Sequence, residues 1–178
     1  MNLHPAFGDF YSLFNLPRAF ALEPARLESA YLDVQGRVHP DRFAHLSENE
    51  RRVSMQWAAH ANEAYQTLRR PLSRARYLLE LGGVDPEIES NTAMPTEFLM
   101  RQMMLREAVE EATDDEDADA LDALIRELKV EARGLEAALG QDFDQNHDLP
   151  AAAGRVRQLM FLDRLQQEIR GALERLDN

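Results

Sequence analysis

The chain has 178 residues, 44% of them hydrophobic, which is enough for one or two small domains with buried cores. It contains no cysteine, and this excludes disulfides, thiolate-bound metals or clusters and cysteine nucleophiles. The net charge of −12 combines +1 on residues 1–75 with −13 on residues 76–178, so the acidic second part would repel nucleic acid.

No membrane or metal-binding pattern is present in the sequence. No apolar run approaches the roughly 20 residues that span a bilayer, and the first residues lack the basic start and apolar core of a signal peptide. The five histidines show no paired ligand spacing. We therefore expect a cytoplasmic protein without a membrane segment, a metal or a cofactor.

Two helices are predicted before residue 39. Asp9 has the side chain of an N-cap and would start a short helix through Phe14. Pro24 suits the first turn of a second helix, which should end at about Val38 because the proline at position 40 disfavours helical backbone before it.

A third helix should run antiparallel to the second. Ser47 and Glu50 have the spacing of a capping box at its start, and Pro71 would end it. Each of the two helices has one apolar stripe, so they should pack as a hairpin. The stripes consist of Leu27, Tyr31, Val34 and Val38 in one helix and of Ala58, Ala61, Tyr65 and Leu68 in the other.

The tripeptide His39-Pro40-Asp41 lies where the first stripe has ended and the second has not begun. An imidazole and a carboxylate beside a rigid proline ring would lose water in a core without replacing it. We therefore expect this motif at the exposed tip of the hairpin, available to another molecule.

The second part of the chain is predicted to be a three-helix bundle. A short helix over 72–81 and a loop over 84–94 come first. The long helices are expected from Pro95 to about Ala112, from the acidic residues 114–119 to Gly140, and from Asp148 to the end. The run 107–119 has eight acids and no base, but lacks the spacing of a calcium loop, so we interpret it as a solvated helix junction.

The helix after Pro95 has two apolar faces. Winding it at about 100° per residue places Phe98, Leu105, Val109 and Ala112 on one side. The opposite side contains Met100, Met103 and Met104, flanked by Leu99 and followed by Glu107 and Glu111. A bundle needs one stripe per helix, so the second face is either a partner-binding surface or part of a core that sandwiches the helix.

Several segments together resemble a known family. Residues 9–17 (DFYSLFNLP), 38–43 (VHPDRF) and 62–68 (NEAYQTL) are similar to a J-domain, the module that activates DnaK-class chaperones. The similarity continues through residues 70–82 (RPLSRARYLLELG), 97–100 (EFLM) and 157–165 (RQLMFLDRL). Over nearly its full length the chain resembles the bacterial HscB family, J-type co-chaperones of iron-sulfur cluster assembly.

The resemblance implies an all-α protein with a J-domain at 1–75, a connecting helix and loop at 76–94, and a scaffold-binding three-helix bundle at 95–178. By resemblance, an HscA/DnaK-class chaperone would be engaged by His39, Pro40 and Asp41, with Arg26, Arg37 and Arg42 steering the contact. An IscU-like scaffold would be bound by Leu99, Met100, Met103, Met104, Glu107, Glu111 and Phe161. Met104 departs from the family, in which this position is acidic, and Phe161 lies off its own stripe, as an exposed aromatic anchor would.

Two other functions compete with this one. The chain could be a J-domain protein that delivers a different client to a DnaK-class chaperone. It could also be a hydrolase that uses His39, but residues two apart around a proline point away from each other and no nucleophile is indicated. We therefore predict a co-chaperone and not an enzyme.

Overall fold

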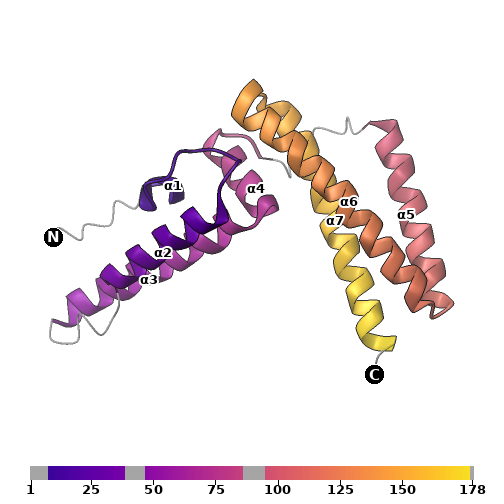
Figure 1. Cartoon of the computed structure of the whole chain (residues 1–178), viewed down its shortest axis with the longest axis horizontal. Coiled ribbons are helices and arrows are strands. Elements are labelled where there is room, and N and C mark those ends of the chain that lie inside the picture. Colours follow the sequence, from indigo (N-terminus) through magenta and orange to yellow (C-terminus); the bar gives the residue numbers. More distant parts are fainter. Residues whose placement is uncertain (1–7, 39–46, 86–94, 177–178) are drawn as a thin grey trace. The chain divides into compact units, whose positions relative to one another are not determined.

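The computed structural model describes residues 8–38, 47–85 and 95–176, and these residues form helices and connecting turns without a strand (Figure 1). The chain divides into two compact units, Met1–Leu78 and Leu79–Asn178. The predicted all-α fold is confirmed. No helix in the described ranges is long and apolar enough to cross a membrane.

The first unit begins with α1 (Phe10–Leu13), and Asp9 caps it as predicted. The Asp9 carboxylate accepts hydrogen bonds from the backbone N–H groups of Tyr11 and Ser12, at 2.9 and 3.0 Å, and pairs with Arg18 at 2.5 Å. Burial raises the pKa of Asp9, but the hydrogen bonds and the Arg18 charge outweigh burial and hold this pKa below its usual range.

A helical hairpin of α2 (Pro24–Val38) and α3 (Glu48–Arg69) comes next in the chain (Figure 1). At the start of α3, the Ser47 hydroxyl accepts from the Glu50 N–H while the Glu50 carboxylate accepts from the Ser47 N–H. The rings of Tyr31 and Tyr65 stack across the hairpin with centroids 4.2 Å apart. Both the capping box and the antiparallel pairing are as predicted.

The helix α4 (Pro71–Leu81) comes directly after the hairpin. Its Tyr77 ring stacks on Phe10 with centroids 4.3 Å apart, and the Tyr77 hydroxyl accepts from the Phe10 N–H at 2.9 Å. The helix ends at Leu81, and in the turn after it Gly83 has a φ of 73°, which is readily adopted only without a Cβ. The boundary between the two units lies inside α4.

The second unit contains the predicted bundle, formed by α5 (Thr96–Asp114), α6 (Ala118–Gln141) and α7 (Leu149–Leu176) (Figure 1). Asp117 caps α6 by accepting from the Ala120 N–H at 2.9 Å, as expected for the acids at this junction. All three helices contribute to one core. It consists of Leu105, Val109, Ala112, Leu121, Ile125, Leu128, Leu162, Leu165, Ile169 and Ala172.

The predicted end of α6 at Gly140 is wrong. The helix continues to Gln141 and then forms a π-helical turn, η2 (Asp142–Asn146). Asp142 and Phe143 in this turn are buried, and the Asp142 carboxylate accepts a hydrogen bond from Arg155 of α7. A glycine costs a helix only about 1 kcal/mol, so these tertiary contacts are sufficient to extend it.

Candidate functional site

The motif predicted to engage a chaperone, His39, Pro40 and Asp41, lies outside the described residues, and so does Arg42. The structure describes the chain on both sides of it. Before the motif, α2 ends at the buried Val38. After it, Ser47 caps α3. The segment 39–46 therefore connects the two helices of the hairpin.

The end of α2 is fixed to α3 by Ser54, a residue that sequence reasoning missed. The Ser54 hydroxyl donates a 2.6 Å hydrogen bond to the carbonyl oxygen of Val38, and Ser54 is only 1% exposed. The position of Ser54 in the sequence could have indicated a buried polar contact. Ser54 lies four residues before Ala58 and so extends the apolar stripe of the third helix with a polar side chain.

Arg26 and Arg37 lie on one exposed face of α2. They are separated by about three helical turns, or roughly 16 Å along the axis. Asp33 lies on the same face between them and pairs with Arg37 at 2.7 Å, with both side chains more than half exposed. The face therefore presents two cations, one of which is partly neutralised.

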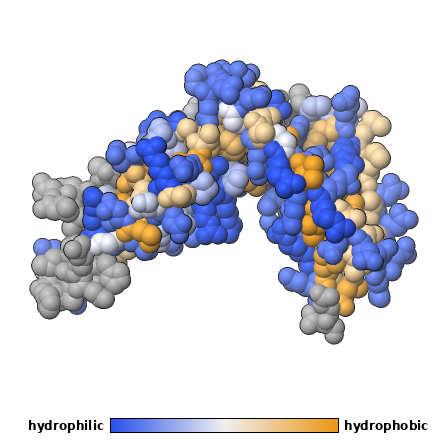
Figure 2. All heavy atoms as spheres, viewed as in Figure 1, coloured by the Kyte–Doolittle hydropathy of each residue, from blue (hydrophilic) through white to orange (hydrophobic). Residues whose placement is uncertain are grey.

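The two faces of α5 differ as predicted. Phe98, Leu105 and Val109 are buried, together with Ala112. Opposite them, the apolar side chains are exposed to solvent, and we call this surface the methionine face (Figure 2). Its members are Leu99 at 44%, Met100 at 61%, Met103 at 73% and Met104 at 60% exposure.

Because these side chains are exposed, the alternative in which both faces of α5 belong to a core is wrong. Glu107 and Glu111 are also exposed and continue the methionine face toward the end of the helix. The surface combines flexible apolar side chains with carboxylates. Such a combination can bind a partner that is apolar in one part and basic in another.

Phe161 is not the exposed anchor that its position on α7 predicted. It is half-buried and packs against the bundle core. Its ring meets that of Phe98 edge to face, with centroids 5.8 Å apart, and the Arg106 guanidinium lies 5.7 Å from its centroid. Phe161 therefore lines the seam between α5 and α7 with only part of its ring accessible.

A groove of about 410 Å³ runs between α5 and α6 at the acidic junction. Its lining consists of Ala108, Glu111, Ala112, Asp115, Asp117, Ala120, Ala123, Leu124 and Glu127. The described residues contain no cluster of three or more histidines and acids arranged to hold a metal ion. The groove acids Glu111, Asp115 and Asp117 are exposed and lie at the connection between α5 and α6.

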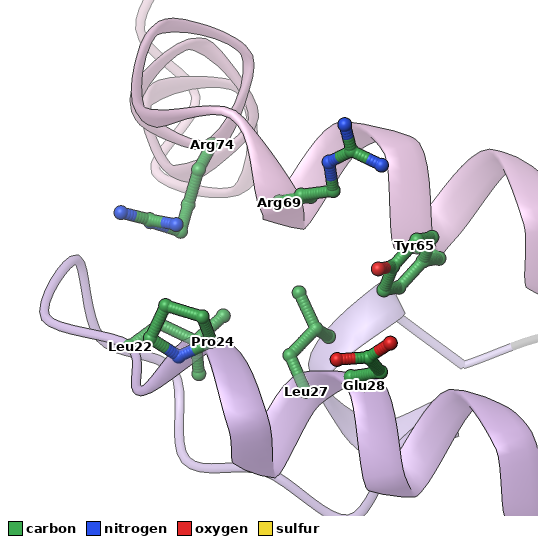
Figure 3. A pocket seen from close by; sticks show the side chains of 7 residues that line it. All are labelled: Leu22, Pro24, Leu27, Glu28, Tyr65, Arg69 and Arg74. Atoms are coloured by element: carbon green, nitrogen blue, oxygen red, sulfur yellow. The ribbon is translucent and has the colours of Figure 1, made fainter.

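A second cavity, of about 230 Å³, lies in the first unit between the start of α2 and the end of α3 (Figure 3). Leu22, Pro24 and Leu27 form one side, and Arg69 and Arg74 lie on the opposite side. Glu28 and Tyr65 complete the lining, so it contains no serine, cysteine or histidine that could act as a nucleophile or base. This cavity is at the end of the hairpin remote from Val38.

The sequence is similar to known co-chaperones along nearly its whole length. The profile of the HSCB C-terminal oligomerisation domain matches residues 94–170. The co-chaperone protein HscB homologs of Cupriavidus taiwanensis and of Azoarcus sp. are each 53% identical over 170 residues, which cover 96% of this chain and 96% of the relative.

Two solved structures share the fold. Chaperone HscB from Vibrio cholerae is 38% identical, with a TM-score of 0.80 over 95% of this chain and 99% of that one. Human co-chaperone protein HscB is 28% identical, with a TM-score of 0.84 over 94% of this chain and 82% of that one. The shared fold, the family profile that matches the bundle and the sequence identity over nearly the full length all agree. The chain belongs to the HscB family of J-type co-chaperones of iron-sulfur cluster assembly.

Proposed function

We propose that this protein stimulates ATP hydrolysis by an HscA/DnaK-class chaperone and delivers an IscU-like scaffold protein to it. Stimulation is assigned to the loop containing His39, Pro40 and Asp41. Arg26, Arg37 and Arg42 would attract an acidic surface of the chaperone, which raises the rate of encounter more than the affinity. Membership of a co-chaperone family supports this assignment.

The observation that carries the scaffold-binding half of the proposal is the methionine face of α5. Four apolar side chains are exposed on a helix whose opposite side already supplies the core. Exposed apolar surface of this kind is stabilised by a partner, and methionines adapt to an irregular one. Glu107 and Glu111 would pair with basic residues of the scaffold, and the accessible part of Phe161 would extend the contact.

The adaptor acts by proximity and performs no covalent chemistry. A chain that contacts the chaperone through one unit and the scaffold through the other raises the concentration of scaffold at the peptide-binding site of the chaperone. This role requires neither a cofactor nor a metal, and we expect it to take place in the cytoplasm. If the methionine face binds another protein, the same mechanism would deliver a different client.

Single-turnover ATP hydrolysis by the chaperone tests the proposal. The wild-type protein should accelerate hydrolysis, and His39→Gln should abolish the acceleration while its affinity for the scaffold stays unchanged. A His39→Gln protein that stimulates normally would disprove the role of the motif. Normal stimulation without measurable scaffold binding would favour a different client.

A further inference from the structure

Three arginines lie around the accessible part of Phe161. Arg157 precedes Phe161 by one turn of α7 and Arg164 comes one turn after it, so these three residues share one stripe of the helix. Arg106 of α5 lies across the seam, with its guanidinium 5.7 Å from the centroid of the Phe161 ring. Arg106 and Arg164 are exposed and Arg157 is half-buried. We call the three arginines the arginine rim.

No acid of the described residues pairs with the arginine rim. Other arginines of the same unit are paired, Arg101 with Glu127 and Arg155 with Asp142. The Nε atom of Arg157 is buried and has no hydrogen-bond partner in the described part of the chain. The fold therefore leaves the carboxylate-binding capacity of the rim unused, and an exposed guanidinium binds a carboxylate through two parallel hydrogen bonds.

The arginine rim is continuous with the methionine face. Arg106 follows Met103 by three residues, and residues at this spacing are neighbours on the surface of a helix. Met103 is 73% exposed, and Arg106 covers part of the Phe161 ring. A partner segment that covers both Met103 and the accessible part of Phe161 would therefore also contact the Arg106 guanidinium.

Charges of opposite sign lie on the two sides of the methionine face. Glu111 lines the groove between α5 and α6, whereas Arg106 lies over Phe161 of α7. The surface thus has a carboxylate on the side of α6 and guanidiniums on the side of α7, with apolar side chains between them. Complementary charges across an interface select the partner and fix its register.

We propose that the arginine rim binds an aspartate or glutamate of the scaffold, next to the apolar residue that covers Phe161. The scaffold segment is then basic where it meets Glu107 and Glu111 and acidic where it meets the rim, so it docks in one orientation only. This inference rests on the proposed function, because it concerns the partner of the same surface. It makes the three arginines residues that determine specificity.

Calorimetric titration of the full-length chain with an IscU-like scaffold at low salt tests the proposal. The double variant Arg106→Gln with Arg164→Gln, called the glutamine variant, should raise the Kd about tenfold, because two partly exposed charge pairs are lost. Arg126→Gln with Arg133→Gln is the matched control, since both arginines are exposed on α6 and the same charge is removed. The Kd of the control should change less than about twofold.

A lysine variant separates charge from packing. Arg106→Lys with Arg164→Lys keeps both charges and should hold the Kd within about threefold of the wild-type value. Added salt should weaken scaffold binding by the wild type more than binding by the glutamine variant, because salt screens charge pairs. The Tm of each variant should stay within about 4 °C of the wild type. Stimulation of the chaperone in the absence of scaffold should be unchanged.

A single substitution covers the case in which the loss of Arg106 disturbs the Phe161 ring. Arg164→Glu reverses the charge of an exposed side chain and should raise the Kd about tenfold. Arg133→Glu is its control and should change the Kd less than about twofold.

The outcomes separate this inference from the proposed function. If the wild type binds the scaffold and Met100→Ala with Met103→Ala weakens binding, but the glutamine variant and Arg164→Glu match their controls, the role of the rim is overturned and the proposed function stands. A lysine variant as weak as the glutamine variant would also overturn it, because the arginines would then act by packing. If the wild type does not bind the scaffold, the proposed function fails and the role of the rim fails with it.

Discussion

The methionine face allows a quantitative prediction. Replacing Met100 and Met103 by alanine removes three side-chain heavy atoms at each position, equivalent to about 2.4 kcal/mol per residue for complete burial. Met100 is 61% exposed and Met103 is 73% exposed, so this fraction of each side chain is available for burial by a partner. The double variant should therefore lose between about 1.5 and 3 kcal/mol of binding free energy. Calorimetric titration with an IscU-like scaffold should show a Kd raised about 10- to 150-fold.

The folded state should not change, because the removed atoms contact mainly solvent. The free energy of unfolding of the double variant is expected within about 0.5 kcal/mol of the wild type. Val130→Ala is a matched control, since Val130 on α6 is 60% exposed and lies outside the methionine face. Its Kd should change less than about twofold. An unchanged Kd in the double variant, or a loss of more than about 1 kcal/mol of stability, would refute the reasoning.

Single contacts give three further predictions. Asp33→Asn removes the acid that pairs with Arg37 and should lower the half-maximal concentration for chaperone stimulation, with a larger effect at low salt; a raised value would contradict the steering role. Leu105→Ala removes a side chain that is 2% exposed and should destabilise the protein by about 2–4 kcal/mol in chemical unfolding. Because the pKa of Asp9 is lowered in the folded state, its pairing with Arg18 should stabilise the protein above about pH 4 and lose that effect as the pH falls through the lower folded pKa. Asp9→Asn should flatten that part of the stability profile, and an unchanged profile would show that the pair is not linked to folding.

The sequence was sufficient to predict the helices where the determining interactions are local. Asp9 and Ser47 cap the helices that come after them, and Glu50 completes the capping box from the first turn of α3. Their hydrogen-bond partners are two or three residues away. Pro24 opens α2 as expected. The two faces of α5 were also predictable, because a helix with a regular period separates them without reference to any other element.

The predictions failed where a contact between distant segments decides the structure. Gly140 was expected to end α6, but the contact between Asp142 and Arg155 extends the chain into η2. Phe161 was expected to be exposed, but Phe98 and Arg106 from another helix cover part of its ring. The hydrogen bond that the Ser54 hydroxyl donates depends likewise on Val38, which lies on a different helix. The periodicity of one helix contains no information about such partners.

The central claim is that one chain must hold the scaffold and activate the chaperone. A complementation assay tests it most directly. The His39→Gln variant should bind the scaffold without stimulating the chaperone. The double variant with Met100→Ala and Met103→Ala should stimulate the chaperone without binding the scaffold. The two variants are mixed with scaffold and chaperone at concentrations near the Kd of the wild-type protein for the scaffold. This mixture should fail to reproduce the stimulation of ATP hydrolysis that the wild-type protein and the scaffold produce together. A mixture that matches the wild type would contradict the account.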